Sequence, residues 1–154
     1  MITIGVDPHK RENEAVVLDE QGRVVERWRG ANDASGWEAL KAWAEQQGEE
    51  REYGFECARS YGRGLAQFLA VCEERVYNIS PHLTAEGRRR AQKRGKSDGQ
   101  DAEAAARVGR AYRERLPMVG LEDETSVLAL LHREREGVKA EGVRVQNQLH
   151  ALLR

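Results

Sequence analysis

The chain has 154 residues, of which 33% are charged, and its formal net charge is −1 at pH 7. This length suits one domain with a single hydrophobic core and is too short for two large domains. The sequence shows neither a signal peptide nor an apolar run near the roughly 18 residues that a membrane span requires, so we expect a cytoplasmic protein without a membrane partner. The two cysteines and four histidines lack the spacing of zinc ligands.

Three strands open the predicted domain. Residues 1–7 alternate apolar with polar or small side chains and end on Asp7. Residues 14–19 and 23–28 are rich in β-branched side chains, and the segment between them, Glu20-Gln21-Gly22, has the length and composition of a hairpin turn. We therefore expect three antiparallel strands at the start of the sheet.

Strands and helices then alternate. Asp33 or Ser35 is a candidate N-cap for a helix with an apolar face. Residues 51–56 form a predicted fourth strand, residues 65–72 an apolar helix face, and residues 76–79 a fifth strand. Strand–helix–strand connections place strands in parallel and cover the sheet with helices. The predicted fold class is therefore α/β, with a mixed sheet and flanking helices.

A basic loop and a helix follow in the second half of the chain. Residues 82–96 are basic, and Gly87 and Gly95 disfavour a helix, so we expect a mobile loop that becomes ordered on a partner. Ser97 is a candidate N-cap for the next helix, which is expected to end before Pro117.

A last, extended helix, predicted to begin at Thr125 or Ser126, carries an apolar repeat at intervals of seven residues, the spacing of a coiled-coil seam. The repeat consists of Leu131, Val138, Val145 and Leu152. Two glycines interrupt the helix, so a short packing helix and a coiled coil both remain open. We expect one domain over residues 1–116 and a coiled-coil-like segment over residues 123–154, which would join copies of the chain into a homodimer or higher oligomer.

Four acids from distant segments stand where ligands gather in an α/β sheet. Asp7 ends the first strand, Glu56 ends the fourth, and Asp98 and Asp101 open a later helix one turn apart. Carboxylate oxygens suit Mg²⁺, with Mn²⁺ as a substitute, and two such ions about 3.5–4 Å apart clamp the attacking and leaving oxygens of a phosphodiester. Because an acid after a strand is by itself a common turn or cap residue, only the joint arrangement predicts a metal site.

The stretch before Asp98 is strongly basic. Every charged side chain in residues 88–96 is cationic, whereas residues 38–56 carry six acids against two cations. A cationic strip binds the backbone of a nucleic acid without reading its sequence. The predicted contacts are Arg88, Arg89, Arg90, Lys93, Arg94 and Lys96.

Five segments, taken together and in order, are similar to a known family. They are residues 4–10 (Ile-Gly-Val-Asp-Pro-His-Lys), Glu56 followed by residues 60–65, Pro81 with the arginine run, residues 95–102, and residues 145–153. Their order and spacing resemble the N-terminal half of the insertion-sequence one-ten family transposases, relatives of the Piv DNA invertases. The resemblance runs nearly end to end and is far more specific than any one of these motifs.

The resemblance implies an RNase H-like domain of the RuvC type. In it an Asp-Glu-Asp-Asp tetrad, here Asp7, Glu56, Asp98 and Asp101, would bind Mg²⁺ at the scissile phosphate of DNA. The family also implies a helical segment and then a second domain with a serine nucleophile, and the two domains break and rejoin DNA under a structured guide RNA at the bacterial nucleoid. This chain ends inside the helical segment, and none of its serines matches the position of the nucleophile.

The leading interpretation is therefore the catalytic N-terminal domain of a DNA transposase, a site-specific recombinase that this chain alone does not complete. One alternative is a RuvC-type junction endonuclease that acts alone, with water as the nucleophile. The other is a non-catalytic module that binds DNA or RNA through residues 88–96, while its acids serve as caps.

Overall fold

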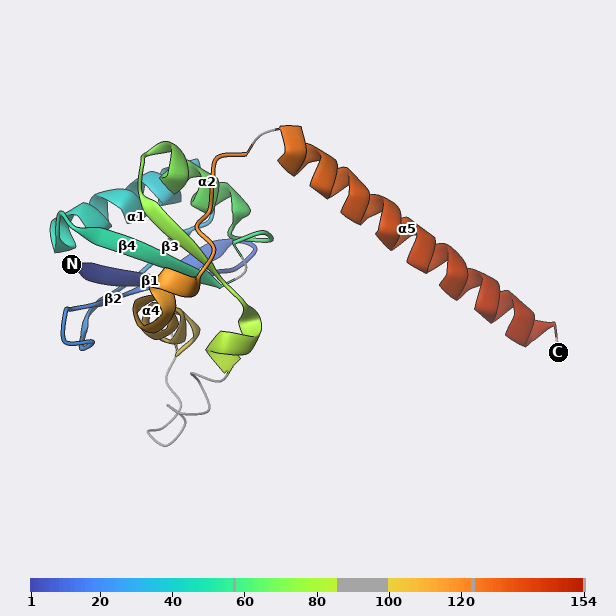
Figure 1. The fold of residues 1–154 in the computed structure, drawn as a ribbon, viewed down its shortest axis with the longest axis horizontal. Helices are drawn as coiled ribbons and strands as arrows, with labels where there is room; N and C mark the ends of the chain where they lie inside the picture. The colour runs from blue at the N-terminus through green and yellow to red at the C-terminus, as the bar shows by residue number, and fades with distance from the viewer. Residues whose placement is uncertain (57, 86–99, 123, 154) are drawn as a thin grey trace. The chain divides into compact units, whose positions relative to one another are not determined.

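The computed structural model describes residues 1–56, 58–85, 100–122 and 124–153. These residues belong to two units, Met1–Leu121 and Glu122–Arg154. The first unit is built on a sheet, and the described part of the second is a single helix (Figure 1). None of the helices in the described ranges is both long and apolar enough to cross a membrane.

The first unit contains a mixed sheet in the strand order β3-β2-β1-β4-β5. The strands are β1 (Ile2–Pro8), β2 (Glu12–Leu18), β3 (Val24–Ala31), β4 (Arg51–Glu56) and β5 (Arg75–Ile79). The first three strands pair antiparallel, and β4 and β5 are added parallel to β1. Gly22, at a φ of 77°, provides the left-handed turn between β2 and β3. The predicted mixed sheet with three antiparallel opening strands is confirmed.

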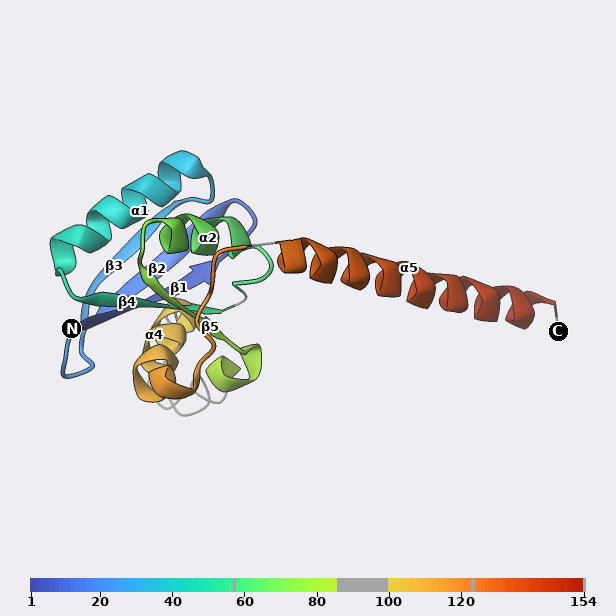
Figure 2. The same cartoon turned by 45° about the horizontal axis from the view of Figure 1, so that its top comes forward.

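Helices cover both faces of the sheet. Helices α1 (Ala34–Gln47) and α2 (Arg63–Val71) lie on one face, and α4 (Gln100–Tyr112) lies on the other (Figure 2). The main core lies under α1 and α2, where Ile4, Val6, Tyr53 and Phe55 of the sheet meet Leu40, Leu65 and Leu69 of the helices. Asp33 caps α1, as predicted, because its Oδ1 accepts a hydrogen bond from the Gly36 N–H at 2.9 Å.

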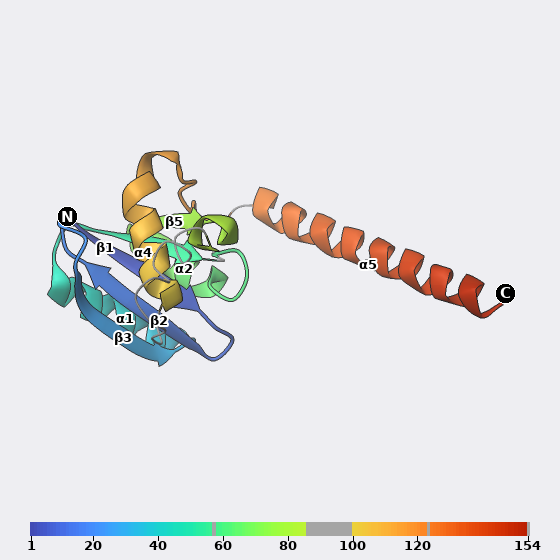
Figure 3. The same ribbon diagram turned by 90° about the horizontal axis from the view of Figure 1, so that it is seen from below.

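Helix α4 lies directly on the backbone of the sheet, across β1, β2 and β4 (Figure 3). A Cβ atom built on Gly5 would come within 1.9 Å of the carbonyl oxygen of Ala102 and 2.3 Å of the backbone nitrogen of Ala106. Ala102 and Ala106 of α4 are buried against Val16 and Leu18 of β2. Gly5 and the small side chains of α4 together therefore set how closely this helix approaches β1.

The prediction of a loop over residues 82–96 is wrong at its start, because residues 81–85 are helical. Pro81 fits the first turn of a helix, where no backbone N–H is needed, and the Thr84 hydroxyl donates to the Pro81 carbonyl oxygen at 2.9 Å. The rest of the predicted basic loop and the predicted N-cap Ser97 lie outside the described residues. Helix α4 is followed by a short 3-10 helix, η2 (Arg113–Arg115), so it ends before Pro117 as expected.

The second unit contains α5 (Glu124–Leu152), a helix of 29 residues and about 44 Å at 1.5 Å per residue. It begins within two residues of the predicted start. The apolar repeat predicted from the sequence is exposed along it, with Leu131 at 61% and Val138 at 71% of full exposure. Ion pairs one turn apart, such as Lys139–Glu136 and Arg144–Glu141, lie on the same helix.

Candidate active site

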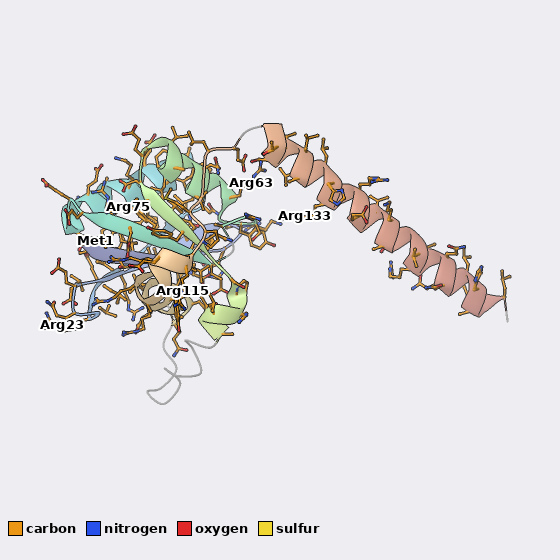
Figure 4. All side chains as sticks on the ribbon, viewed as in Figure 1. Met1, Arg23, Arg63, Arg75, Arg115 and Arg133 are labelled. Atoms are coloured by element: carbon orange, nitrogen blue, oxygen red, sulfur yellow. The ribbon has the colours of Figure 1, made fainter. Side chains whose placement is uncertain are left out.

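Two of the predicted acids lie side by side at the carboxyl ends of neighbouring parallel strands. Gly5 of β1 pairs with Gly54 of β4, and Asp7 and Glu56 follow two residues later on the same strands. Side chains two residues apart point to the same face of a sheet, so both carboxylates lie on the face covered by α4. This end of the sheet lies opposite Met1, which precedes β1. Figure 4 labels Met1 and also Arg63, which begins α2 after β4.

The third acid, Asp101, reaches the same place from α4. It lies in the first turn of that helix, one residue before Ala102, whose carbonyl oxygen lies over Gly5 of β1. Because Gly5 is two residues before Asp7, the close packing of α4 on β1 brings Asp101 toward the strand end. An acidic side chain is also favoured in the first turn of a helix by the helix dipole.

Electrostatics shows that these acids influence one another. Burial raises the pKa of the Asp7 carboxyl above its ordinary value, the imidazole of His9 opposes this shift, and the carboxylates of Asp101, Glu56 and Glu14 raise the pKa further. The side chain of Asp7 is 17% exposed. Asp7 and Glu56 therefore end neighbouring strands, and Asp101 lies near enough for its charge to act on Asp7. The fourth predicted acid, Asp98, lies outside the described residues.

The chemistry of this donor set fits a hard divalent cation. Within the described ranges, no three His, Cys, Asp or Glu side chains are grouped so that they could hold a metal ion. The donors offered by Asp7, Glu56 and Asp101 are nevertheless all carboxylate oxygens, which Mg²⁺ and Mn²⁺ prefer. A cation between them would also relieve the mutual repulsion that raises the pKa of Asp7.

Two neighbours of Asp7 were not singled out by the sequence analysis. His9 Nε2 lies 3.3 Å from Asp7 Oδ2, with the His9 side chain 50% exposed, and Glu14 is the cross-strand partner of Asp7 in the β1–β2 ladder. The Asp-Pro-His spacing could have indicated His9, because it puts positions i and i+2 on one side of an extended chain. The hairpin register could have indicated Glu14. A register cannot be read from the turn sequence alone when the loop is longer than two residues.

Another acid in the first turn of α4 is engaged elsewhere. Glu103 accepts hydrogen bonds from Arg27 of β3 at 2.6 Å and from Arg107, one turn later in α4, at 2.8 Å. These bonds tie α4 to the antiparallel edge of the sheet. Glu103 therefore serves the packing of the helix, whereas Asp101, two residues earlier, is one of the charges that act on Asp7.

The predicted nucleic-acid contacts, Arg88, Arg89, Arg90, Lys93, Arg94 and Lys96, all lie outside the described residues. The described part of the site thus consists of its acidic half.

Comparisons with known proteins identify both a family and a fold. A family model described as a transposase, of the DEDD type of insertion sequence IS110, matches residues 4–154. No curated protein matches the chain. The matched range includes helix α5 and all of the sheet unit except its first three residues.

Two solved structures of RuvC from Thermus thermophilus have a similar fold. RuvC in complex with a Holliday junction substrate is 12% identical, with a TM-score of 0.57 over 77% of this chain and 99% of that one. A second structure of the same protein is 13% identical, with a TM-score of 0.58 over 77% of this chain and 100% of that one. The predicted RNase H-like fold of the RuvC type is thereby confirmed.

Proposed function

The chain belongs to the family of DEDD transposases of the insertion-sequence one-ten type, and from this premise we propose that it is the catalytic domain of a DNA transposase that breaks phosphodiester bonds with the help of a divalent cation. The observation that supports the proposal is that Asp7 and Glu56 end neighbouring parallel strands while the charge of Asp101, from α4, also acts on Asp7. These acids come from three segments far apart in the sequence, so their convergence is a property of the fold.

Each of these residues has a distinct task in the proposed site. Asp7 and Glu56 are fixed by the sheet and would hold Mg²⁺ from β1 and β4, while Asp101, and Asp98 as predicted from the sequence, would complete the set from the α4 side. When bound, the cation would supply Lewis-acid stabilisation of charge at the scissile phosphate. His9 restrains Asp7 through the 3.3 Å contact and keeps one carboxylate oxygen in a defined orientation.

The finer parts of the proposal come from the family resemblance. A structured guide RNA would select the DNA, and a serine-bearing domain would provide the nucleophile for strand transfer. The same carboxylates would also serve a junction endonuclease that uses water, and the fold shared with RuvC, which was solved with a Holliday junction substrate, favours this as the second candidate.

One experiment separates the two candidates. The 154-residue chain and a transposase that also carries the proposed serine-bearing domain are each incubated, with the guide RNA, with a four-way DNA junction and with a duplex carrying transposon ends, in Mg²⁺ or in EDTA. We expect Mg²⁺-dependent strand transfer from the complete transposase and no turnover of the junction by the chain alone. Efficient junction cleavage by the chain alone would favour the endonuclease, and the absence of cleavage by either protein in Mg²⁺ or Mn²⁺ would reject both.

We further propose that the basic residues 88–96 bind the backbone of the nucleic acid. Changing the three arginines at 88–90 to glutamine is expected to weaken binding. It should also reduce the steepness of the slope of log affinity against log salt by about 2.7, because each lost contact to B-DNA reduces that slope by about 0.9. A matched control changes Arg23, Arg75 and Arg115 (Figure 4), which keeps the net charge of the two variants equal. An unchanged slope in the first variant would reject the proposed contacts.

We also propose that α5 joins copies of the chain through its apolar repeat. Val138→Lys places a charge in the repeat and is expected to shift the protein toward the monomer in sedimentation-equilibrium experiments. Val143→Lys is the control, because Val143 is similarly exposed, at 57% against 71% for Val138, but lies outside the seven-residue spacing. A wild-type protein that stays monomeric over a wide concentration range would contradict the proposal.

A further inference from the structure

Asn32, in the short connection between β3 and α1, makes hydrogen bonds to three separate segments. Its Nδ2 donates to the carbonyl oxygen of His9 at 2.7 Å and to that of Tyr61 at 3.0 Å. Its Oδ1 accepts from the indole Nε1 of Trp37 at 2.8 Å, and its backbone N–H donates to the carbonyl oxygen of Arg11 at 2.9 Å. Both amide protons of the side chain and its oxygen are thus engaged at once.

The two carbonyl groups that Asn32 holds belong to the two turns beside the candidate active site. His9 is in the β1–β2 turn, two residues after Asp7, and its imidazole contacts the Asp7 carboxylate at 3.3 Å. Tyr61 is in the β4–α2 turn, which begins directly after Glu56. One amide group therefore bridges the segments that follow the two strand-borne acids, each within five residues of its acid.

The β4–α2 turn also touches the ends of β1 and β4, at a point where no side chain fits. A Cβ atom built on Gly62 would lie 2.7 Å from Cγ of Pro8 and 3.2 Å from Cδ1 of Phe55. The β4–α2 turn thus packs directly on the end of β1. Such close packing transmits a displacement of the β4–α2 turn to the end of β1, because a packed contact has no free volume to absorb it.

The third bond fastens Asn32 to the helical layer. Trp37, which donates to Asn32 Oδ1, lies in the second turn of α1, and its ring covers Gly64 of α2, where an added Cβ would come within 2.5 Å of the ring. The ring also packs beside Phe68, with 6.1 Å between ring centroids. Asn32 is consequently held by α1 and α2 while it holds the two turns.

We infer that Asn32 is a positioning residue of the active site: by binding the β1–β2 and β4–α2 turns simultaneously, it fixes the ends of β1 and β4, and with them Asp7 and Glu56, relative to each other. It touches neither acid and acts through the backbone of the turns. The catalytic consequence rests on the function proposed above, whereas the mechanical link between the turns does not. Groups that hydrogen-bond directly to metal ligands typically change metal affinity about 10- to 100-fold, and Asn32, one step further out, is expected to act at the lower end of this range.

Two substitutions at Asn32 and one at its neighbour test this inference. Asn32→Ala removes all three side-chain bonds. Asn32→Asp retains an acceptor for Trp37 but turns a carboxylate oxygen toward two carbonyl oxygens, so it should loosen the turns more than alanine does. Asp33→Ala is the matched control, because it removes the N-cap bond to Gly36 and destabilises α1 without touching either turn.

Two measurements are made on each variant: amide hydrogen exchange of residues 9–12 and 59–63, and the affinity for Mn²⁺ by isothermal titration calorimetry. Both Asn32 variants are expected to exchange faster in both turns and to bind Mn²⁺ at least about tenfold more weakly. In a cleavage assay they should raise the Mg²⁺ concentration for half-maximal rate more than they lower the rate at saturating Mg²⁺. Asp33→Ala should lower the melting temperature while leaving both turns and Mn²⁺ affinity within about twofold of wild type.

The opposite results overturn the inference. Unchanged exchange in the turns of both Asn32 variants would show that the amide does not hold them together, and an equal loss of Mn²⁺ affinity in Asp33→Ala would attribute the effect to general destabilisation. If the wild-type protein neither binds Mn²⁺ nor cleaves DNA, the proposed function fails, and the exchange comparison alone then decides whether Asn32 links the two turns.

Discussion

Asp7→Asn is expected to lower metal-dependent strand cleavage by the complete transposase by a factor of about 10² to 10³. The amide has the shape of the carboxylate but no charge, so it cannot neutralise a divalent cation, and Asp7 is the acid on which the charges of Asp101 and Glu56 both act. Cleavage is measured on a duplex carrying transposon ends in saturating Mg²⁺. Asp101→Asn, and Asp98→Asn as predicted from the sequence, should have comparable effects.

The folded state of the Asp7→Asn protein should be as stable as wild type or more stable in metal-free buffer at pH 7. Burial raises the pKa of the Asp7 carboxyl, and nearby carboxylates add to the shift. The pKa of Asp7 is therefore higher in the folded state than in the unfolded state. The protonated carboxyl makes its whole contribution to stability at a pH below the unfolded-state pKa, and this contribution is lost as the pH rises through the folded-state pKa. Asparagine avoids that loss, and its advantage should disappear below the ordinary value of 3.8.

A control substitution in the first turn of α4, which also contains Asp101, distinguishes the loss of a proposed metal ligand from the loss of a negative charge. Glu103→Gln removes an acid that binds Arg27 and Arg107 and should retain most of the cleavage activity. Wild-type cleavage by a folded Asp7→Asn protein would reject the metal site. A loss of activity in Glu103→Gln as large as that in Asp101→Asn would show that the activity depends on the charge of α4 in general.

Gly5→Ala is expected to destabilise the domain by about 3 kcal/mol and to impair cleavage as well. The added methyl group would lie 1.9 Å from the carbonyl oxygen of Ala102 and 2.3 Å from the backbone nitrogen of Ala106. Backbone atoms of a helix cannot rotate away as a side chain can, so α4 would have to lift from β1 and carry Asp101 with it. Urea-induced unfolding measures the stability, and the Mn²⁺ affinity of the folded fraction reports the displacement of Asp101.

Gly109→Ala, on the same helix and against the same sheet, is the matched control. Its added Cβ would meet the Cα of Gly54 and the Cγ2 of Thr3 at 3.5 Å, an ordinary contact. Because alanine is favoured over glycine inside a helix by about 1 kcal/mol, this substitution should leave the free energy of unfolding unchanged or raise it. A Gly5→Ala protein that unfolds at the wild-type urea concentration would contradict the close packing of α4 on β1.

Local patterns explain which parts of the fold could be predicted. The alternation in residues 1–7 and the turn chemistry near Gly22 depend on neighbouring residues only, so β1 and the β2–β3 hairpin are readable directly. The N-cap Asp33 and the start of α5 are local in the same sense. The helix at residues 81–85 was missed because the basic composition of the whole segment outweighed the helix-starting signal of Pro81.

The site divides in the same way between what is local and what is not. The sequence by itself determined which acids are candidates, because Asp7 and Glu56 end predicted strands and Asp98 and Asp101 open a predicted helix, and it determined the start and apolar spacing of α5. Only the tertiary structure decided that β4 lies next to β1 and that Gly5 lets α4 rest on the backbone of the sheet. It also decided that His9 and Glu14 lie beside Asp7, and that Asn32 joins the turns that follow Asp7 and Glu56. The physical reason is that secondary structure follows from interactions within a few residues, whereas the contact between α4 and β1 joins segments about 100 residues apart. The only sequence feature that reflects this contact is Gly5, and glycine also occurs for many other reasons, so the contact could not be predicted from it.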